Sequence, residues 1–380
     1  MSKIITSTLE KISAPEKRSI ISGPFGSNIS SKFFVESGVP VIRGNNLTIG
    51  HEKFIDSGFV FVTKEKAEEL NCYAYYNDLI FTAAGTLGQV GIIPQNATFD
   101  EYVISNKQIR VRLNTDIIDV MYAFYWFSSP WITQKLSNSN KGSTVPLLTL
   151  AEIRELPITY PESLDEQRRI VKMLDSLSDK IANNHRINNN LLQIATTMFD
   201  YLFARQKPNG KLSEIVEEHS KSTVQVGDSE GVIGDYPFFT SGETINEWAT
   251  YMVDGINCFL STGGNASVKV FSGKAAYSTD TWCISGKGKY SAYLYFYLKS
   301  IIKSIDTSFF AGSGLKHLQK DNLLAVEIYI PSEEEIEAFN KVVIPALNQA
   351  ATLFFENKKL IDQRNFLLPL LMNGQATINS

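Results

Sequence analysis

The chain repeats itself after about 170 residues. Residues 142–161 (GSTVPLLTLAEIRELPITYP) have a counterpart of the same length in residues 312–331 (GSGLKHLQKDNLLAVEIYIP), and a long apolar-periodic stretch follows each copy. Upstream, residues 81–90 have an echo in residues 259–268. A repeat this long indicates a duplicated domain rather than the short unit of a solenoid. A chain with two similar halves suits a target that also has two halves.

Composition excludes several classes of protein. The 380 residues can bury two or more cores, and 43% hydrophobic with 20% charged residues is ordinary for a globular protein. No apolar run approaches the roughly 18 residues that a membrane helix needs, and the N-terminal segment lacks the apolar core of a secretion signal. We therefore expect a cytoplasmic protein with no membrane partner. The net charge of −4 means that any DNA contact must come from local patches or from a partner.

The pattern of turns and apolar periodicity divides the chain into four segments. Gly and Pro punctuate short β-prone runs in the two globular segments, whereas the other two segments read as helices of about 40 residues. The predicted fold class is α+β, with two strand-rich domains joined by two long helices that pair as an antiparallel coiled coil. The predicted boundaries are 1–160 and 207–330 for the strand-rich domains, and 161–206 and 331–380 for the helical spacers.

Each long helix carries an apolar seam with heptad-like spacing, which predicts helix pairing. Asn184 and Asn188 interrupt the first seam, and a shift of 169 residues places Asn188 on Asn357, so the polar position recurs. A helix of about 40 residues spans about 60 Å, somewhat less than two turns of B-DNA, so the pair resembles a ruler. The residues predicted to pair the helices are Ile170, Leu174, Leu177, Ile181, Asn188, Leu191, Phe339, Val343, Ala350, Asn357 and Leu360.

Motifs for catalysis are missing from the sequence. Methyl transfer needs a glycine-rich nucleotide loop and an Asn-Pro-Pro-Tyr-type pocket, and ATP binding by a P-loop needs Gly-x-x-x-x-Gly-Lys-Ser/Thr; neither pattern occurs. The four histidines are scattered, and Cys72, Cys258 and Cys283 lack metal-ligand spacing, which favours buried thiols. We expect no catalytic residues, no metal ligands and no cofactor in this chain.

Loops rich in Arg, Lys, Asn, Gln, Ser and Thr are suited to reading DNA, because these side chains match the donors and acceptors on base edges and phosphates. Three such loops occur in each half of the chain, and for any single residue a solvated turn remains an open alternative. The candidate DNA-binding residues of the first half are Arg43, Asn45, Asn46, Thr82, Thr86, Gln89, Asn138, Asn140, Lys141, Ser143 and Thr144. Those of the second half are Ser241, Thr262, Asn265, Ser267, Lys269, Ser313, Lys316 and His317.

Several motifs, together with the duplication, carry a resemblance to a known family. They are residues 23–27 (GPFGS), 38–46 (GVPVIRGNN), 77–81 (NDLIF), 161–170 (PESLDEQRRI) and 366–374 (FLLPLLMNG). In this order, and with two spaced helices, the chain resembles the DNA specificity subunit of type I restriction-modification systems. The second half departs from the pattern: it has no clear copy of the GPFGS turn, and Glu335-Ile336 stands where Glu166-Gln167 stands in the first half.

The resemblance implies two target recognition domains, each reading half of a bipartite double-stranded DNA site, with the helices setting the spacing. It also implies two methyltransferase subunits that carry S-adenosylmethionine and two restriction subunits that use ATP and Mg²⁺. The alternatives are a two-module interaction scaffold that is not specific for DNA, and a methyltransferase fused to recognition domains. The missing methyl-donor loop speaks against the fused methyltransferase.

Overall fold

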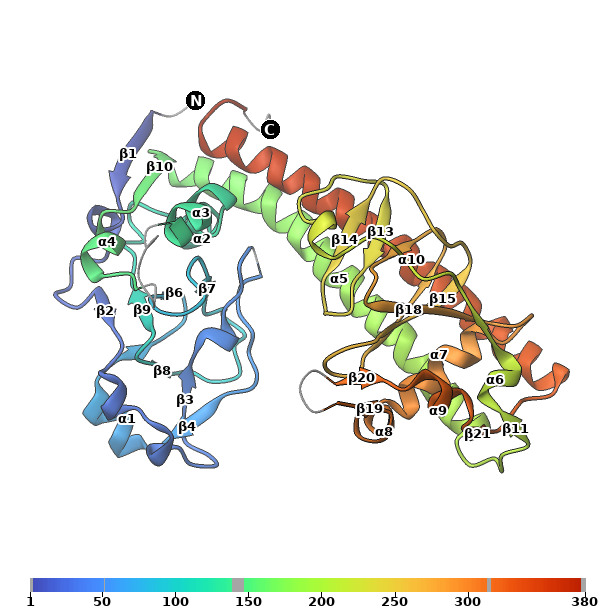
Figure 1. The fold of residues 1–380 in the computed structure, drawn as a ribbon. Coiled ribbons are helices and arrows are strands. Elements are labelled where there is room, and N and C mark those ends of the chain that lie inside the picture. Colours follow the sequence, from blue (N-terminus) through green and yellow to red (C-terminus); the bar gives the residue numbers. More distant parts are fainter. Residues whose placement is uncertain (1–2, 51, 139–146, 313–315, 377–380) are drawn as a thin grey trace. The chain divides into compact units, whose positions relative to one another are not determined.

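The computed structural model describes residues 3–50, 52–138, 147–312 and 316–376. It divides into two compact units, residues 1–181 with 359–380, and residues 182–358. Each unit combines a strand-rich domain with one stretch of each of two long helices, α5 (Leu164–Phe203) and α10 (Glu333–Met372) (Figure 1). The predicted fold class is confirmed. Each long helix contributes residues to both units.

The described residues of the first unit form two four-stranded sheets and a separate two-stranded ribbon. The first sheet, in the order β2-β9-β6-β7, is antiparallel throughout, whereas the second, β4-β3-β8-β5, joins β3 and β8 in parallel. The ribbon pairs β1 with β10. The strands are β1 (Ile4–Thr8), β2 (Ile20–Ser22), β3 (Val39–Ile42), β4 (Val60–Val62), β5 (Tyr73–Ala74), β6 (Leu79–Thr82), β7 (Val90–Ile92), β8 (Tyr102–Ile104), β9 (Gln108–Val111) and β10 (Pro157–Pro161).

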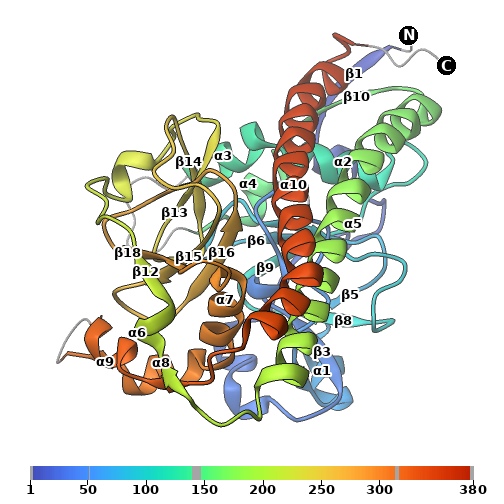
Figure 2. The ribbon, with the colours of Figure 1, turned by 90° about the vertical axis from the view of Figure 1, so that its right-hand side faces the viewer.

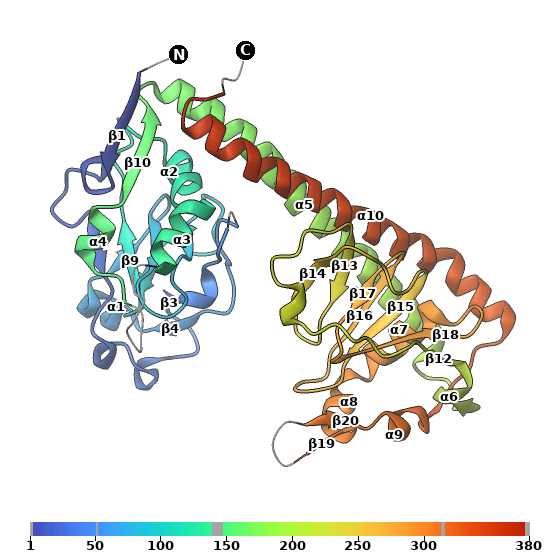
Figure 3. The ribbon, with the colours of Figure 1, turned by 45° about the horizontal axis from the view of Figure 1, so that its top comes forward.

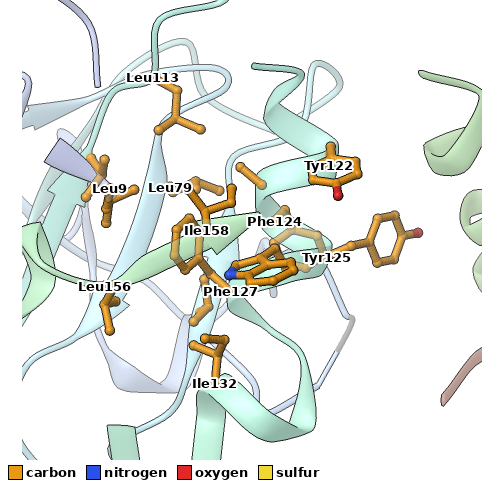
Figure 4. Packing of buried hydrophobic residues seen from close by; sticks show 14 of the residues in the cluster. Leu9, Leu79, Leu113, Tyr122, Phe124, Tyr125, Phe127, Ile132, Leu156 and Ile158 are labelled. Carbon is orange, nitrogen blue, oxygen red and sulfur yellow. The ribbon is translucent and has the colours of Figure 1, made fainter. Parts of the chain in front are cut away.

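The core of the first unit forms around the buried helix α2 (Val120–Phe127). Its aromatic side chains lie with Leu79 of β6 and Ile158 of β10 in one cluster (Figure 4). A helix that is apolar on all sides is stable only when buried in this way. Asp119 begins α2 because its carboxylate accepts a hydrogen bond of 3.0 Å from the Tyr122 N–H. The other helices of the domain are α1 (Lys64–Leu70), α3 (Pro130–Asn138) and α4 (Leu150–Arg154).

The second unit repeats this topology. A sheet in the order β12-β18-β15-β16 corresponds to β2-β9-β6-β7, and β14-β13-β17 corresponds to β4-β3-β8 with the same parallel pair. The strands are β11 (Gly210–Lys211), β12 (Val216–Glu218), β13 (Tyr236–Phe239), β14 (Ile245–Trp248), β15 (Ile256–Ser261), β16 (Val268–Ser272), β17 (Ala276–Tyr277), β18 (Thr281–Gly286), β19 (Phe310–Ala311), β20 (His317–Leu318) and β21 (Glu327–Ile328). The helices are α6 (Leu212–Ile215), α7 (Ser291–Ser300), α8 (Ile302–Ser308) and α9 (Lys320–Leu324).

Strand register corrects one detail of the predicted repeat. In the first unit Phe81 pairs with Val90, and in the second Leu260 pairs with Val268. Leu260, and not Phe259, therefore corresponds to Phe81. The hairpin between the paired residues is one residue shorter in the second unit, which the sequence echo did not reveal.

Within each unit, the stretches of α5 and α10 lie side by side (Figure 2, Figure 3). In the second unit Asn184 donates to Asn357 Oδ1 over 2.9 Å, while Phe199 lies near Phe339, so the two helices run antiparallel. In the first unit the Arg364 guanidinium donates to Ser178 Oγ over 3.5 Å. Among the described residues, no helix combines the length and the apolar character that crossing a membrane requires.

Most residues of the predicted seams are buried. The buried positions are Ile170, Leu174, Ile181, Phe339, Val343, Asn357 and Leu360, and the half-buried positions are Leu177, Asn188, Leu191 and Ala350. The partner of Asn357 is Asn184, whereas the Oδ1 atom of Asn188 is buried with no hydrogen-bond partner among the described residues. The two polar positions of α5 therefore have different surroundings.

Candidate nucleic-acid interface

Two of the predicted DNA-reading loops meet at one pocket of the first unit, with a volume of about 540 Å³. Arg43 and Asn45 come from the loop that follows β3, and Thr82, Thr86 and Gln89 come from the β6–β7 hairpin. The turn 105–108, which is not among the predicted loops, lines the third side of the pocket. The sheet order brings these segments together, because β9 follows this turn and lies beside β6.

The loop after β3 takes its shape from Asn46, a residue predicted to contact DNA. Asn46 is fully buried: its Oδ1 accepts from the Arg43 N–H over 3.0 Å, and its amide donates to the Ile55 and Ser57 carbonyls. These bonds occupy the donors and the acceptor that a base contact would use. Asn46 therefore positions the loop. The neighbouring Asn45 is exposed, with its amide on the Gly58 carbonyl at 3.2 Å.

Thr82 and Gln89 tie the hairpin to the loop after β3. Thr82 is 2% exposed and donates to Gln89 Oε1 over 2.9 Å. The Gln89 amide donates to the Gly44 and Leu47 carbonyls over 3.1 and 2.9 Å. Both side chains are therefore engaged within the protein, whereas Thr86 at the hairpin tip is exposed.

The turn 105–108 packs against the GPFGS segment, which explains one glycine of that motif. A Cβ atom at Gly23 would lie 1.8 Å from the Ser105 carbonyl oxygen, so a side chain does not fit there. The turn presents Asn106 and Lys107 to solvent. Among the described residues, no carboxylate lies within ion-pair distance of Lys107 or Arg43, and none lines the pocket. The pocket is thus cationic and suits an anionic or acceptor-rich ligand.

The corresponding loops of the second unit are tied together by a different side chain. The Lys269 ammonium donates to the carbonyl oxygens of Thr240, over 2.9 Å, and of Gly242. Burial lowers the pKa of Lys269 below the ordinary value for lysine. This bridge joins β16 to the loop after β13, as Gln89 joins β7 to the loop after β3. Lys269 is therefore a structural tether as well as a predicted DNA contact.

Ser241, Thr262, Asn265 and Ser267 also belong to these loops, whereas Lys316 and His317 belong to the third predicted loop. Thr262 Oγ1 donates to the Asp280 carbonyl over 2.9 Å, and Ser267 Oγ donates to the Ser241 carbonyl over 3.4 Å. Asn265 is exposed. Lys316 and His317 are exposed as well, and the Lys316 carbonyl accepts from the Gly264 N–H over 3.2 Å.

Part of the third predicted loop in each half falls outside the described residues. In the first unit Asn138 is exposed at the end of α3. The predicted residues Asn140, Lys141, Ser143, Thr144 and Ser313 are not among those that the structure describes.

Within the described ranges, no three side chains of the His, Cys, Asp and Glu types come together as metal ligands would. The three cysteines are buried free thiols, and burial raises the pKa of Cys72 to about 11. Their burial agrees with the prediction of packed thiols.

The architecture defines a class: a protein with two copies of one recognition domain, each copy attached to a shared pair of antiparallel helices. The chain belongs to the type I restriction-modification DNA specificity family. The family profile, described as the type I restriction modification DNA specificity domain, matches residues 26–193 and again residues 208–362. The two matches correspond to the two copies of the fold.

Individual relatives agree with the family profile. The chain is 25% identical to the MjaIX specificity subunit of Methanocaldococcus jannaschii over 171 residues, which are 45% of this chain and 38% of that protein. It is 22% identical to the HindI specificity subunit of Haemophilus influenzae, covering 73% of this chain and 82% of that protein. The crystal structure of a type I restriction-modification S subunit from M. genitalium has the same fold, with a TM-score of 0.58, 13% identity and 98% and 96% of the two chains covered.

Proposed function

We propose that this specificity subunit reads a bipartite DNA site, with one half-site bound by each strand-rich domain. The observation that supports this most strongly is the recurrence of one set of loops on one sheet topology in both units. The side chains on these loops differ, for example Gln89 where the second unit has Ser267. Equivalent loops with different donors and acceptors suit two half-sites of different sequence.

The helix pair supports a spacer role. α5 and α10 each contain 40 residues, which corresponds to about 60 Å of helix. Each helix continues from one unit into the other without interruption. We propose that this pair sets the number of base pairs between the half-sites.

We further propose that the subunit makes and breaks no bonds itself. Its partners would be two methyltransferase subunits, which supply S-adenosylmethionine, and two restriction subunits, which supply ATP-driven cleavage with Mg²⁺. The family membership supports this assignment, and the sequence motifs for binding the methyl donor or ATP are missing from the chain.

Selection from random duplexes tests the DNA-reading role. The full chain, with its methyltransferase partner added, should enrich a motif of two short blocks separated by a run of unspecified bases. Enrichment of no motif would favour the interaction scaffold that is not specific for DNA. Calorimetry with S-adenosylmethionine and the isolated chain should give no binding heat, and clear binding would support a fused methyltransferase.

A paired insertion tests the spacer role. Seven helical residues are added after Ile181 in α5 and seven after Lys358 in α10, so that the antiparallel pairing is kept. This lengthens the pair by about 10 Å, or about three base pairs. The selected motif should keep both blocks and change only their spacing. A change in the blocks themselves would contradict the spacer role.

A further inference from the structure

The two units contain a pair of equivalent turns, 105–108 and 278–281. In the first unit the Ser105 N–H donates to the Ile42 carbonyl over 2.9 Å, and in the second the Ser278 N–H donates to the Phe239 carbonyl over 3.0 Å. Each turn then closes on itself with a bond of 3.1 Å, from Gln108 to Ser105 and from Thr281 to Ser278. The turns 105–108 and 278–281 therefore have the same backbone connections.

Lys107 and Asp280 occupy the same position in these two turns. The Lys107 carbonyl accepts from the Ala83 N–H over 2.7 Å, and the Asp280 carbonyl accepts from the Thr262 N–H over 3.1 Å. Both side chains are exposed, and neither has an ion-pair partner among the described residues. A cation and an anion thus occupy one structural position, each free to meet a ligand.

The negative charge of Asp280 indicates whether this position faces a phosphate or a base edge of DNA. A carboxylate that approached a phosphate would be repelled, because both groups carry negative charge. A carboxylate is useful at a DNA surface where it accepts a hydrogen bond from a base, as from the N4 amino group of cytosine. A position that carries Asp280 in one unit is therefore suited to base edges. Lys107, at the same position, would meet the O6 and N7 acceptors of guanine.

We propose that Lys107 and Asp280 are specificity-determining residues at corresponding positions of the two half-sites. Lys107 selects a guanine in one half-site, and Asp280 selects a cytosine in the other. This proposal rests on the proposed function, because it assumes that each unit reads one half-site. It deepens that function by naming the base that each turn recognises.

The test uses selection from random duplexes with the full chain and its methyltransferase partner. Lys107→Gln should lower the preference for guanine at one position of one half-site by about tenfold. Lys107→Asp should convert that guanine to cytosine, and Asp280→Lys should convert the cytosine of the other half-site to guanine. Matched controls are Lys17→Gln and Asp235→Asn. Both residues are exposed and lie outside the proposed DNA-reading loops, so these variants should leave the motif unchanged.

Each variant contains its own folding control, since the half-site read by the unaltered unit should be recovered intact. If Lys107→Gln weakens binding to all sequences equally and flattens its salt dependence, Lys107 contacts phosphate and the proposal is wrong. The same holds if both half-sites keep their bases in every variant. If the unaltered protein enriches no motif, the proposed function itself is wrong. If the unaltered protein enriches a motif that no variant changes, only the proposal for Lys107 and Asp280 is wrong.

Discussion

The two units tether their neighbouring loops with different side chains. In the first unit the neutral amide of Gln89 ties the hairpin to the loop after β3, and in the second the ammonium of Lys269 ties β16 to the loop after β13. Both side chains donate to backbone carbonyls, so a neutral amide in one unit and a cation in the other form the same kind of tether from different positions. Residue type at a tether says little about the ligand. The exposed positions beside the tethers, Lys107 and Asp280, carry that information.

In contrast to the tethers, the cores of the two units use the same residue type for an equivalent hydrogen bond. Tyr122 of α2 donates to the Thr159 carbonyl over 2.9 Å, and Tyr293 of α7 donates to the Tyr329 carbonyl. In both units a buried tyrosine thus joins the domain helix to the segment that leads into a long helix. Packing and buried hydrogen bonds constrain a position more strongly than solvent does.

The largest expected effect is a loss of stability in the second unit that leaves the first unit unchanged. Phe339 is fully buried in the core of the second unit, with the rings of Phe203 and Phe296 at 5.4 and 6.0 Å. Phe339→Ala should lower the free energy of unfolding of that unit by about 3–5 kcal/mol through lost burial and a cavity. Hydrogen exchange should show faster amide exchange in β15, with β6 of the first unit unchanged.

Two controls sharpen this comparison. Ile170→Ala, at the repeat-equivalent position in the core of the first unit, should instead accelerate exchange in β6. Val342→Ala, on the exposed side of α10, should change stability by less than about 0.5 kcal/mol. Equal acceleration in both units by Phe339→Ala would mean that they unfold together.

The two asparagines of α5 should respond in opposite directions. Asn184→Leu breaks the bond to Asn357 and should cost about 1–3 kcal/mol, because a buried acceptor loses its donor. Asn188→Leu removes a buried oxygen that has no partner in the described part of the chain, and should raise the free energy of unfolding by about 1 kcal/mol. Urea denaturation of the two variants measures both. Destabilisation of the same size in both variants would contradict the difference in their surroundings.

The equivalent tyrosines predict a smaller, pH-dependent effect. Tyr122→Phe and Tyr293→Phe should each cost about 0.5–1.5 kcal/mol at pH 7, because each removes a hydroxyl that donates to backbone carbonyls inside the protein. Burial raises the pKa of both tyrosines above 10. Above pH 10 the unfolded chain loses these protons while the folded chain keeps them, so stability falls as pH rises. The double variant should show a shallower fall above pH 10, and an unchanged slope would argue against this linkage.

The smallest effect concerns the charged tether. Since burial lowers the pKa of Lys269, the folded chain releases this proton at a pH where the unfolded chain still holds it. The contribution of Lys269 to the free energy of unfolding should therefore rise with pH in the window just below 10.5. Lys269→Gln, which keeps a neutral donor at this position, should remove that rise in urea denaturations at pH 8 and 10. Gln89→Ala should leave the rise in place.

Local patterns predicted the helices well. The periodicity predicted one long helix within 161–206 and another within 331–380, and the structure has α5 at Leu164–Phe203 and α10 at Glu333–Met372. Their starts are local too: Ser332 and Glu335 exchange hydrogen bonds in a capping box at the beginning of α10. Such features depend on residues a few positions apart, which a sequence displays directly.

The candidate site was predicted less completely. The loops were found by their polar composition, yet Asn46 and Thr82 within them are buried, and Gln89 is engaged in tethering. The turn with Asn106 and Lys107 was missed although it has the same composition as the chosen loops. Its place in the pocket follows from the pairing of β9 with β6, between segments about 30 residues apart. A single sequence does not display such pairing.

The sequence by itself determined the duplication, the two long helices, the α+β class and the family, because repeats, periodicity and motifs are all written along the chain. Tertiary structure alone decided which polar side chains face solvent, which asparagine meets Asn357, and that Lys107 and Asp280 occupy one position. These outcomes depend on strand register and burial. Both depend on contacts between segments that lie far apart in the sequence, and a local sequence pattern does not reveal the free energies of such contacts.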